Sequence, residues 1–228
     1  MSRTIPAAVA FTALLFVALS CVSGARAQST SAEGSASAPS APGAPGSQAN
    51  PDAGTDAGPA TGGREIEFWS GGGPSIHGGI QGLGVWNTGF RYGWILTAPH
   101  GPGFLRGRFE YAVDAVPIFW VIQPGGTAYG VVLVPMALKW DLATRGRVVP
   151  YMDIDGGVLF TNRLTPPGIS TINFTPSAAL GFYLLRHKYN WSAEFRFLHI
   201  SDASLTKLNP GINTLEVRLG FGLFTHPK

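Results

Sequence analysis

Two kinds of side chain alternate along the stretch Trp191-Ser192-Ala193-Glu194-Phe195-Arg196-Phe197-Leu198-His199-Ile200-Ser201. Apolar Trp, Ala and Phe take the odd positions up to 197, and Ser, Glu and Arg take the even positions up to 196. Successive side chains of a β-strand point to opposite faces, so the pattern predicts a strand with one apolar and one charged face. His199 and Ser201 continue the apolar parity, about 6.6 Å apart along such a strand. A base beside a hydroxyl is the minimum for nucleophilic catalysis, so the candidate catalytic pair lies on the apolar face.

The same period of two recurs from residue 64 onward, in segments bounded by Gly, Pro or Asn. It predicts eight strands, at about 64–70, 85–97, 104–118, 128–141, 148–158, 173–185, 190–201 and 213–224. Charges of both signs fall mid-strand on the non-apolar parity: Arg106, Arg108, Glu110, Asp114, Asp153, Asp155, Glu194, Arg196, Glu216 and Arg218. Mixed charges on one parity favour a paired network that fills a narrow lumen.

Two closed architectures fit this alternation: a soluble barrel with apolar side chains inside, and a membrane barrel with apolar side chains facing lipid. The mid-strand charges favour the membrane barrel, although a soluble sandwich could expose them to water. All of these strands except the first are also long enough for a bilayer crossing, for which about 9–11 tilted residues suffice. We therefore predict an all-β protein, an eight-stranded antiparallel outer-membrane β-barrel. A pore is disfavoured because side chains fill the lumen of eight strands.

The N-terminal part has the composition of an exported protein. Residues 1–27 read as a signal peptide, with an apolar run followed by Ala25-Arg26-Ala27. Leu19-Ser20-Cys21 resembles the end of a lipobox, so lipoprotein processing is the alternative; cleavage after Ala27 would leave no cysteine. Residues 28–63 are almost wholly Ser, Ala, Gly, Pro, Thr and Asp and predict a disordered linker. Residues 64–228 then form the barrel domain.

The charge of the chain argues against nucleic acid as a partner. The formal net charge is only +3, and the basic residues are scattered rather than clustered. The expected partner is the membrane, and nothing in the sequence specifies an oligomeric state.

Connection lengths predict which end of the barrel faces outward. Outer-membrane barrels have short periplasmic turns and longer external loops, with both termini inside. The predicted connections 71–84, 119–127, 159–172 and 202–212 are longer than 98–103, 142–147 and 186–189. Periplasmic termini would place His199 and Ser201 near the external end, facing lipid. The expected substrate is a lipid of the outer leaflet.

The segment His199-Ile200-Ser201, followed by Asn209-Pro210-Gly211-Ile212-Asn213, resembles the lipid A 3-O-deacylase family, also called the PagL or acyloxyacyl hydrolase-like family. The resemblance implies an outer-membrane esterase that removes the 3-hydroxyacyl chain at position 3 of lipid A, in lipopolysaccharide, without metal or organic cofactor. It also implies that Ser201 is the nucleophile, His199 the base and Asn209 an oxyanion donor, with Gly211 in support.

Two positions depart from the family pattern. The family has Glu where this chain has Asn213, and Asn directly after the serine where this chain has Asp202. Glu216 could replace the missing carboxylate, but strand parity sends it into the lumen, so Asn213 is the better orienting partner for the imidazole. An amide cannot stabilise the imidazolium by charge, which predicts slower chemistry or reliance on Asp202. The alternative function is a catalytically silent structural barrel of the same fold.

Overall fold

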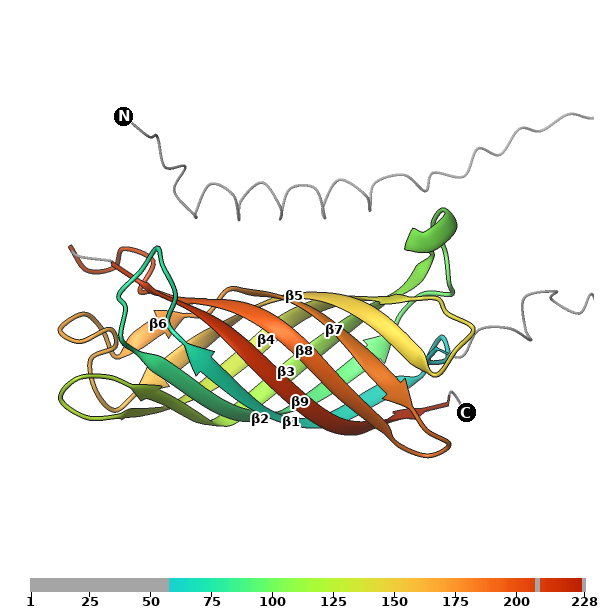
Figure 1. Ribbon diagram of the computed structural model, residues 1–228, viewed down its shortest axis with the longest axis horizontal. Coiled ribbons are helices and arrows are strands. Elements are labelled where there is room, and N and C mark those ends of the chain that lie inside the picture. Colours follow the sequence, from blue (N-terminus) through green and yellow to red (C-terminus); the bar gives the residue numbers. More distant parts are fainter. Residues whose placement is uncertain (1–57, 208–209, 227–228) are drawn as a thin grey trace, which may run out of the picture. The chain divides into compact units, whose positions relative to one another are not determined.

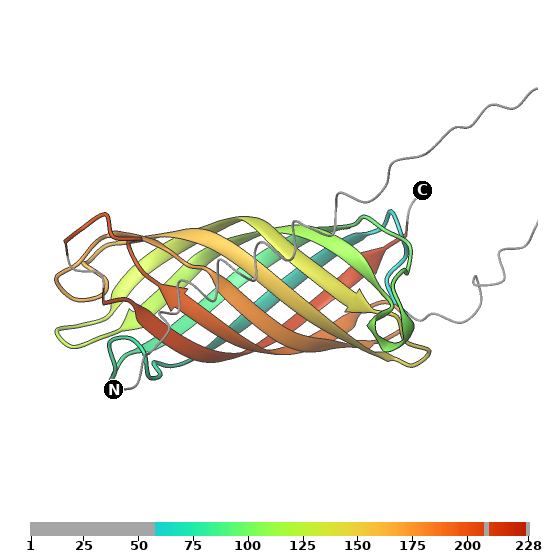
Figure 2. The same ribbon diagram turned by 90° about the horizontal axis from the view of Figure 1, so that it is seen from above.

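The computed structural model describes residues 58–207 and 210–226. Within them the strands form one antiparallel sheet that closes on itself, because β1 pairs with β9 and β4 pairs with β5 (Figures 1 and 2). The strands are β1 (Arg64–Pro74), β2 (Gly84–Ile95), β3 (Gly107–Ile122), β4 (Ala128–Leu142), β5 (Val148–Thr161), β6 (Ile172–Phe174), β7 (Ser177–Leu185), β8 (Asn190–Ile200) and β9 (Ile212–Thr225). Both β6 and β7 pair with β5 and together take one place in the wall. The predicted eight-stranded antiparallel barrel is confirmed.

Some of the predicted segments lie partly or wholly outside the residues that the structure describes. The signal peptide, the linker up to residue 57 and Asn209 lie outside the described residues. The last six residues of the predicted linker, 58–63, are described, and the Gly62 amide donates to the Ile95 carbonyl at 2.9 Å. No helix in the described part of the chain is long and apolar enough to cross a membrane.

The barrel has two ends that we name by their connections. The turn end carries connections 96–106, 143–147 and 186–189 together with the start of β1 and the end of β9, and the loop end carries 75–83, 123–127, 162–171 and 201–211. The predicted alternation of long and short connections was wrong in two places. Connection 96–106 matches 201–211 in length because it contains a 3-10 turn, η1 (Gly103–Leu105), and 123–127 is short because β3 runs on to Ile122.

Two strand predictions are also corrected. The third strand begins at Gly107 rather than 104, so Arg106 is half-buried beside η1 instead of mid-strand. The sixth predicted strand is interrupted at Thr175–Pro176, where β6 ends and β7 begins. Proline has no N–H for a ladder hydrogen bond, which accounts for a break at this position.

The charged parity faces the lumen, as predicted. The Arg196 guanidinium binds Asp153 at 3.0 Å and Glu194 at 2.7 Å, and it also binds Asp155. Arg91 binds both Asp114 and Asp153 at 2.8 Å. Lys139 binds Glu65, Glu110 and the Tyr183 hydroxyl. Buried charges are tolerated when they are paired, and these groups form two paired clusters in the lumen, one around Arg91 and Arg196 and one around Lys139.

The interior near the loop end is apolar, which strand parity alone did not predict. Register shifts in β3 and β4 coincide with Pro117 and Pro135. A bulge changes which residues point inward, so Phe119 and Val121 are buried while Ile118 is 41% exposed. Phe119 and Val121 join an interior cluster that also contains Leu198, Ile200 and Ile212. The lumen is therefore ionic in its middle and turn-end parts and closed by apolar side chains at the loop end.

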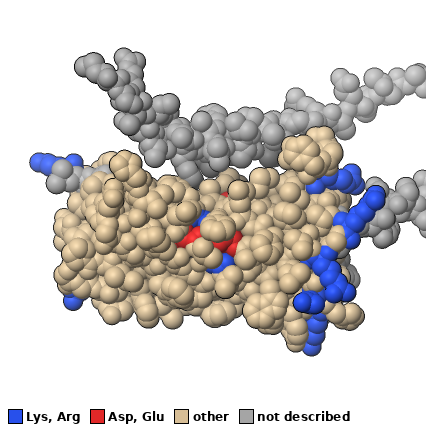
Figure 3. All heavy atoms as spheres, in the orientation of Figure 1, with Lys and Arg blue, Asp and Glu red and all other residues tan. Residues whose placement is uncertain are grey.

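The outer wall is apolar and carries aromatic residues toward both ends. Phe195, Leu180 and Leu219 are each more than 60% exposed at mid-wall. Trp86, Trp120 and Tyr129 lie toward the loop end, and Trp94, Tyr111, Trp140, Tyr189 and Trp191 lie toward the turn end. Figure 3 shows a wall largely free of charge on this face, with a small charged patch near its middle and most of the visible basic side chains at the turn end. Aromatic girdles around an apolar band are typical of a barrel that crosses a membrane.

Candidate active site

His199 and Asn213 face each other across β8 and β9 near the loop end. Both lie on the outward parity, and the His199 Nδ1 is 2.6 Å from the Asn213 Oδ1. An amide oxygen can only accept a hydrogen bond, so Nδ1 is the donor and carries the ring proton. This tautomer leaves a lone pair on Nε2, which is the form that a general base requires. The cross-strand amide thus orients the imidazole.

Backbone packs closely around this pair. Gly211 has a φ of +62°, and a Cβ placed there would lie 2.7 Å from the His199 Cε1. Gly78 has a φ of +98°, and its Cβ would lie 2.9 Å from the Asn213 Nδ2. Only glycine combines the left-handed conformation with the missing side chain that these approaches need. Gly211 therefore leaves room for the His199 imidazole because it has no side chain.

Connection 75–83 is hydrogen-bonded to the main chain of Gly211 and Asn213. The Ile76 N–H donates to the main-chain carbonyl of Asn213 at 2.7 Å, and the Ile80 N–H donates to the main-chain carbonyl of Gly211 at 3.0 Å. Asn213 is only 4% exposed as a result, although its parity is outward. Sequence reasoning missed this contribution. The adjacent glycines Gly78 and Gly79 are the signal that the sequence offers for it.

Ser201 lies one outward position beyond His199, where β8 has ended. Its amide and carbonyl pair with Phe174 at 3.1 and 2.7 Å, and the residue is 7% exposed. Among the described residues, no hydrogen bond joins the Ser201 hydroxyl to the His199 ring. The structure thus brings His199 and Asn213 together and places Ser201 next along the same face.

Asp202 shapes the loop that follows. Its carboxylate accepts from the Thr206 hydroxyl at 2.5 Å, from the Thr206 amide at 2.8 Å and from the Ser204 amide at 3.0 Å. The hydrogen bond from the Thr206 hydroxyl is the main reason that the pKa of Asp202 is lowered, with the backbone amides adding to it. Ala203 and Ser204 both adopt positive φ angles, of 54° and 66°. Asp202 therefore stabilises a strained turn directly after the serine.

Glu216 is excluded as a partner of His199. It is fully buried in the lumen, where its carboxylate accepts from Asn87 at 3.1 Å and from Arg218 at 3.2 Å. The prediction from parity holds at this position.

The surroundings of the site on the outer wall are apolar. Leu215 is 46% exposed and Phe174 is 38% exposed, and Phe197 precedes His199 on the same face. These side chains form an apolar surface beside the imidazole.

Comparison with known proteins gives one family match. The family model described as lipid A 3-O-deacylase (PagL) matches residues 86–222. No curated protein matches the chain.

Several solved barrels resemble the structure at low identity. The outer membrane enzyme PagL is 18% identical, over 68% of this chain and 97% of that chain, with a TM-score of 0.49. The outer membrane protein OprG from Pseudomonas aeruginosa is 12% identical, over 75% and 99%, with a TM-score of 0.49. The N-terminal barrel domain of Pseudomonas aeruginosa OprF is 11% identical, over 72% and 98%, with a TM-score of 0.47.

Proposed function

The chain belongs to the lipid A 3-O-deacylase (PagL) family, and from this premise we propose that it is an outer-membrane esterase that hydrolyses the 3-O-linked 3-hydroxyacyl chain of lipid A. The observation that carries the proposal is the His199–Asn213 hydrogen bond on the apolar outer face, with Ser201 next along that face. A site that faces lipid suits a substrate whose ester lies at the surface of a membrane.

The proposed reaction is acyl transfer in two steps. The His199 Nε2 takes the proton of Ser201 as the hydroxyl oxygen attacks the ester carbonyl, and the imidazolium then protonates the departing lipid A hydroxyl. Water, deprotonated by the same nitrogen, attacks the acyl-enzyme and releases the 3-hydroxy fatty acid and the free serine. Hydrogen bonds at catalytic residues often tighten only when substrate is bound, so a short rotation of the Ser201 side chain completes the pair.

The other site residues act through these two. Asn213 holds the imidazole in the reactive tautomer, and Gly211 leaves room for the ring. Asn209 and the backbone N–H of Gly211 are our candidates for oxyanion donors. Asp202 supports the turn that carries Ser201 rather than supplying charge to the ring.

The proposal includes an orientation. The loop end faces the outside of the cell, so that His199 meets the outer leaflet, and both ends of the barrel sequence face the periplasm. Residues 1–27 would be removed as a signal peptide and 28–63 would form the linker. Mass measurement of the mature protein tests the cleavage site, because processing at Cys21 would leave a longer, lipid-modified chain.

The function is tested with lipid A and the full mature protein in detergent. We expect mass spectrometry to show loss of one 3-hydroxyacyl group with the wild type, and none with Ser201→Ala or His199→Ala. Matched controls are Ser204→Ala, an exposed serine of the same loop, and His77→Ala, an exposed histidine of the same end. Lipid A that stays intact with the wild type, or wild-type activity in both Ser201→Ala and His199→Ala, would leave a structural barrel as the function.

A further inference from the structure

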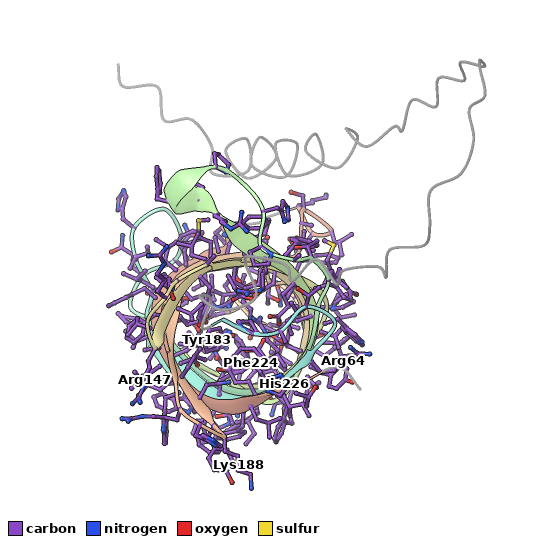
Figure 4. The ribbon with its side chains drawn as sticks, turned by 90° about the vertical axis from the view of Figure 1, so that its right-hand side faces the viewer. Arg64, Arg147, Tyr183, Lys188, Phe224 and His226 are labelled. Atoms are coloured by element: carbon purple, nitrogen blue, oxygen red, sulfur yellow. The ribbon has the colours of Figure 1, made fainter. Side chains whose placement is uncertain are left out.

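A pocket lies at the turn end, at the opposite end of the barrel from His199. Its volume is about 220 Å³, many times the roughly 10–15 Å³ that a water molecule needs. Three segments enclose it: 58–60, 185–190, and the C-terminal part of the described chain, with Phe224 in β9 and His226 just after it. In Figure 4, which looks onto this end, Phe224 and His226 lie inside the ring of strands and Lys188 lies at its margin. The pocket is thus a part of the mouth of the barrel.

The charge around this pocket is of one sign. Arg186 and Lys188 are exposed and border it, together with His187 and His226. None of the residues that line it is an Asp or Glu. The carboxylates of the described strands are buried in the ionic lumen, where most of them are paired with Arg or Lys. The neighbouring turn adds Arg145 and Arg147, so the whole mouth favours an anion (Figure 3).

A buried amide at the pocket lacks a partner. Asn190 lines the pocket and is only 1% exposed, and neither its Nδ2 nor its Oδ1 has a hydrogen-bond partner among the described residues. A buried polar group without a partner is costly, so it marks a place where a ligand or water completes the bonding. Its donor and acceptor together suit a group that carries both phosphate and hydroxyl oxygens.

Apolar surface completes the pocket. Phe224 and Leu185 line one part of it and pack against Tyr183, and the Lys188 ammonium lies 5.4 Å from the centre of the Tyr189 ring. This combination of cationic margin, polar floor and apolar wall recognises the glycerol phosphate part of a molecule better than a bare inorganic ion.

We propose that this pocket binds a phosphate ester, with the anion held by the 186–188 turn and the ester's hydroxyl or glycerol oxygens bonded to Asn190. The same chemistry is available from the headgroup of an anionic phospholipid in the adjacent leaflet and from a soluble phosphate ester. The site is separate from the proposed esterase, and its ligand is bound rather than converted.

The test uses the full mature protein in a maltoside detergent, which contains no phosphate. Native mass spectrometry compares retention of phosphatidylglycerol and phosphatidylcholine of matched acyl chains, and calorimetric titration compares sn-glycerol 3-phosphate with inorganic phosphate. Preference for phosphatidylglycerol identifies the lipid source, whereas saturable binding of glycerol 3-phosphate with no lipid preference identifies a soluble one.

Variants locate the binding. We expect Arg186→Gln/Lys188→Gln to weaken it about 25-fold, from about fivefold for each cation removed. Asn190→Asp, which keeps the shape but places a second anion at the floor, should also weaken it. Arg145→Gln/Arg147→Gln removes equal charge from the neighbouring turn outside the pocket and should change binding less than fivefold. Heat-dependent migration on gels confirms that each variant is folded.

Three results would overturn the proposal. One is a wild type that binds neither the phospholipid nor glycerol 3-phosphate above a phosphate-free analogue. Another is equal weakening by the two double variants, which would mean diffuse attraction by the rim. The third is unchanged binding in both Arg186→Gln/Lys188→Gln and Asn190→Asp. None of these results depends on activity toward lipid A.

Discussion

Changing Asn213 to Asp tests whether the amide limits the chemistry. The side chains have the same shape, so the carboxylate oxygen of Asn213→Asp would take the position that is now 2.6 Å from the His199 Nδ1. A hydrogen bond between neutral groups contributes about 0.5–1.5 kcal/mol, and one to a charged group about 1.5–3 kcal/mol. The gain of about 1–1.5 kcal/mol applies when the ring becomes an imidazolium, in the transition state. It corresponds to a rate increase of about five- to twelvefold.

Removing the same bond should have the opposite effect. Asn213→Leu leaves the His199 N–H without its acceptor, at a cost of about 1–3 kcal/mol, or about 5- to 150-fold in rate. The assay is the initial rate of 3-hydroxy fatty acid release from lipid A, measured by mass spectrometry over a range of lipid A concentrations.

A control separates local from general charge effects. Asn162→Asp adds the same charge at the loop end, in an exposed position whose oxygen accepts from the Tyr129 amide at 2.9 Å. It should leave the rate unchanged. If Asn213→Asp and Asn162→Asp have equal rates while Asn213→Leu stays fully active, the amide does not orient the base and our account of the site is wrong.

Three further changes test the site, the interior and the outer wall. Gly211→Ala should abolish most activity because its Cβ would meet the His199 ring, whereas Gly82→Ala, with a φ of +77° and no atom within 4 Å, should cost only about 1–2 kcal/mol of stability. Arg196→Met should lower the free energy of unfolding in urea by about 3–5 kcal/mol, because it leaves its buried carboxylate partners unpaired. Phe195→Arg should destabilise the barrel in lipid by about 2–4 kcal/mol, whereas Phe104→Arg, at 87% exposure outside the strands, should have little effect.

Each of these predictions has a clear contrary result. Equal activity of the two glycine variants would show that ring packing is unimportant. If Arg196→Met unfolds at the same urea concentration as the wild type, the ionic interior does not stabilise the barrel. Equal stability of the two phenylalanine variants in lipid would argue that the wall at Phe195 does not face hydrocarbon.

The sequence specified the parts of the fold that depend on strand parity. Arg196 and Glu216 point inward, and His199 and Asn213 outward, because each position in a regular strand fixes the face of the next. The bulges near Pro117 and Pro135 were not foreseen. A proline shows that a ladder bond is missing, but the number of residues that bulge depends on the partner strand.

The part of the site that comes from a distant segment of the chain could not be predicted from the sequence either. Gly78 and Gly79 contact Asn213 and Gly211, which follow them by more than 130 residues in the chain. Without a register for β1 against β9, nothing connects these glycines to the histidine. The predicted His199–Asn213 pairing was accessible only because β8 and β9 are consecutive and joined by one loop.

The ionic interior has a further role, because it fixes the register on which the outer site depends. Across β8 and β9, Glu194 faces Arg218 and Arg196 faces Glu216, as His199 faces Asn213. A slip of one residue would turn one strand's charges toward hydrocarbon, at about 2–4 kcal/mol for each arginine near the middle of the bilayer. The same slip would separate the His199 imidazole from the Asn213 side-chain amide. Charge pairs that never meet the substrate therefore select the one strand alignment in which the two site residues meet.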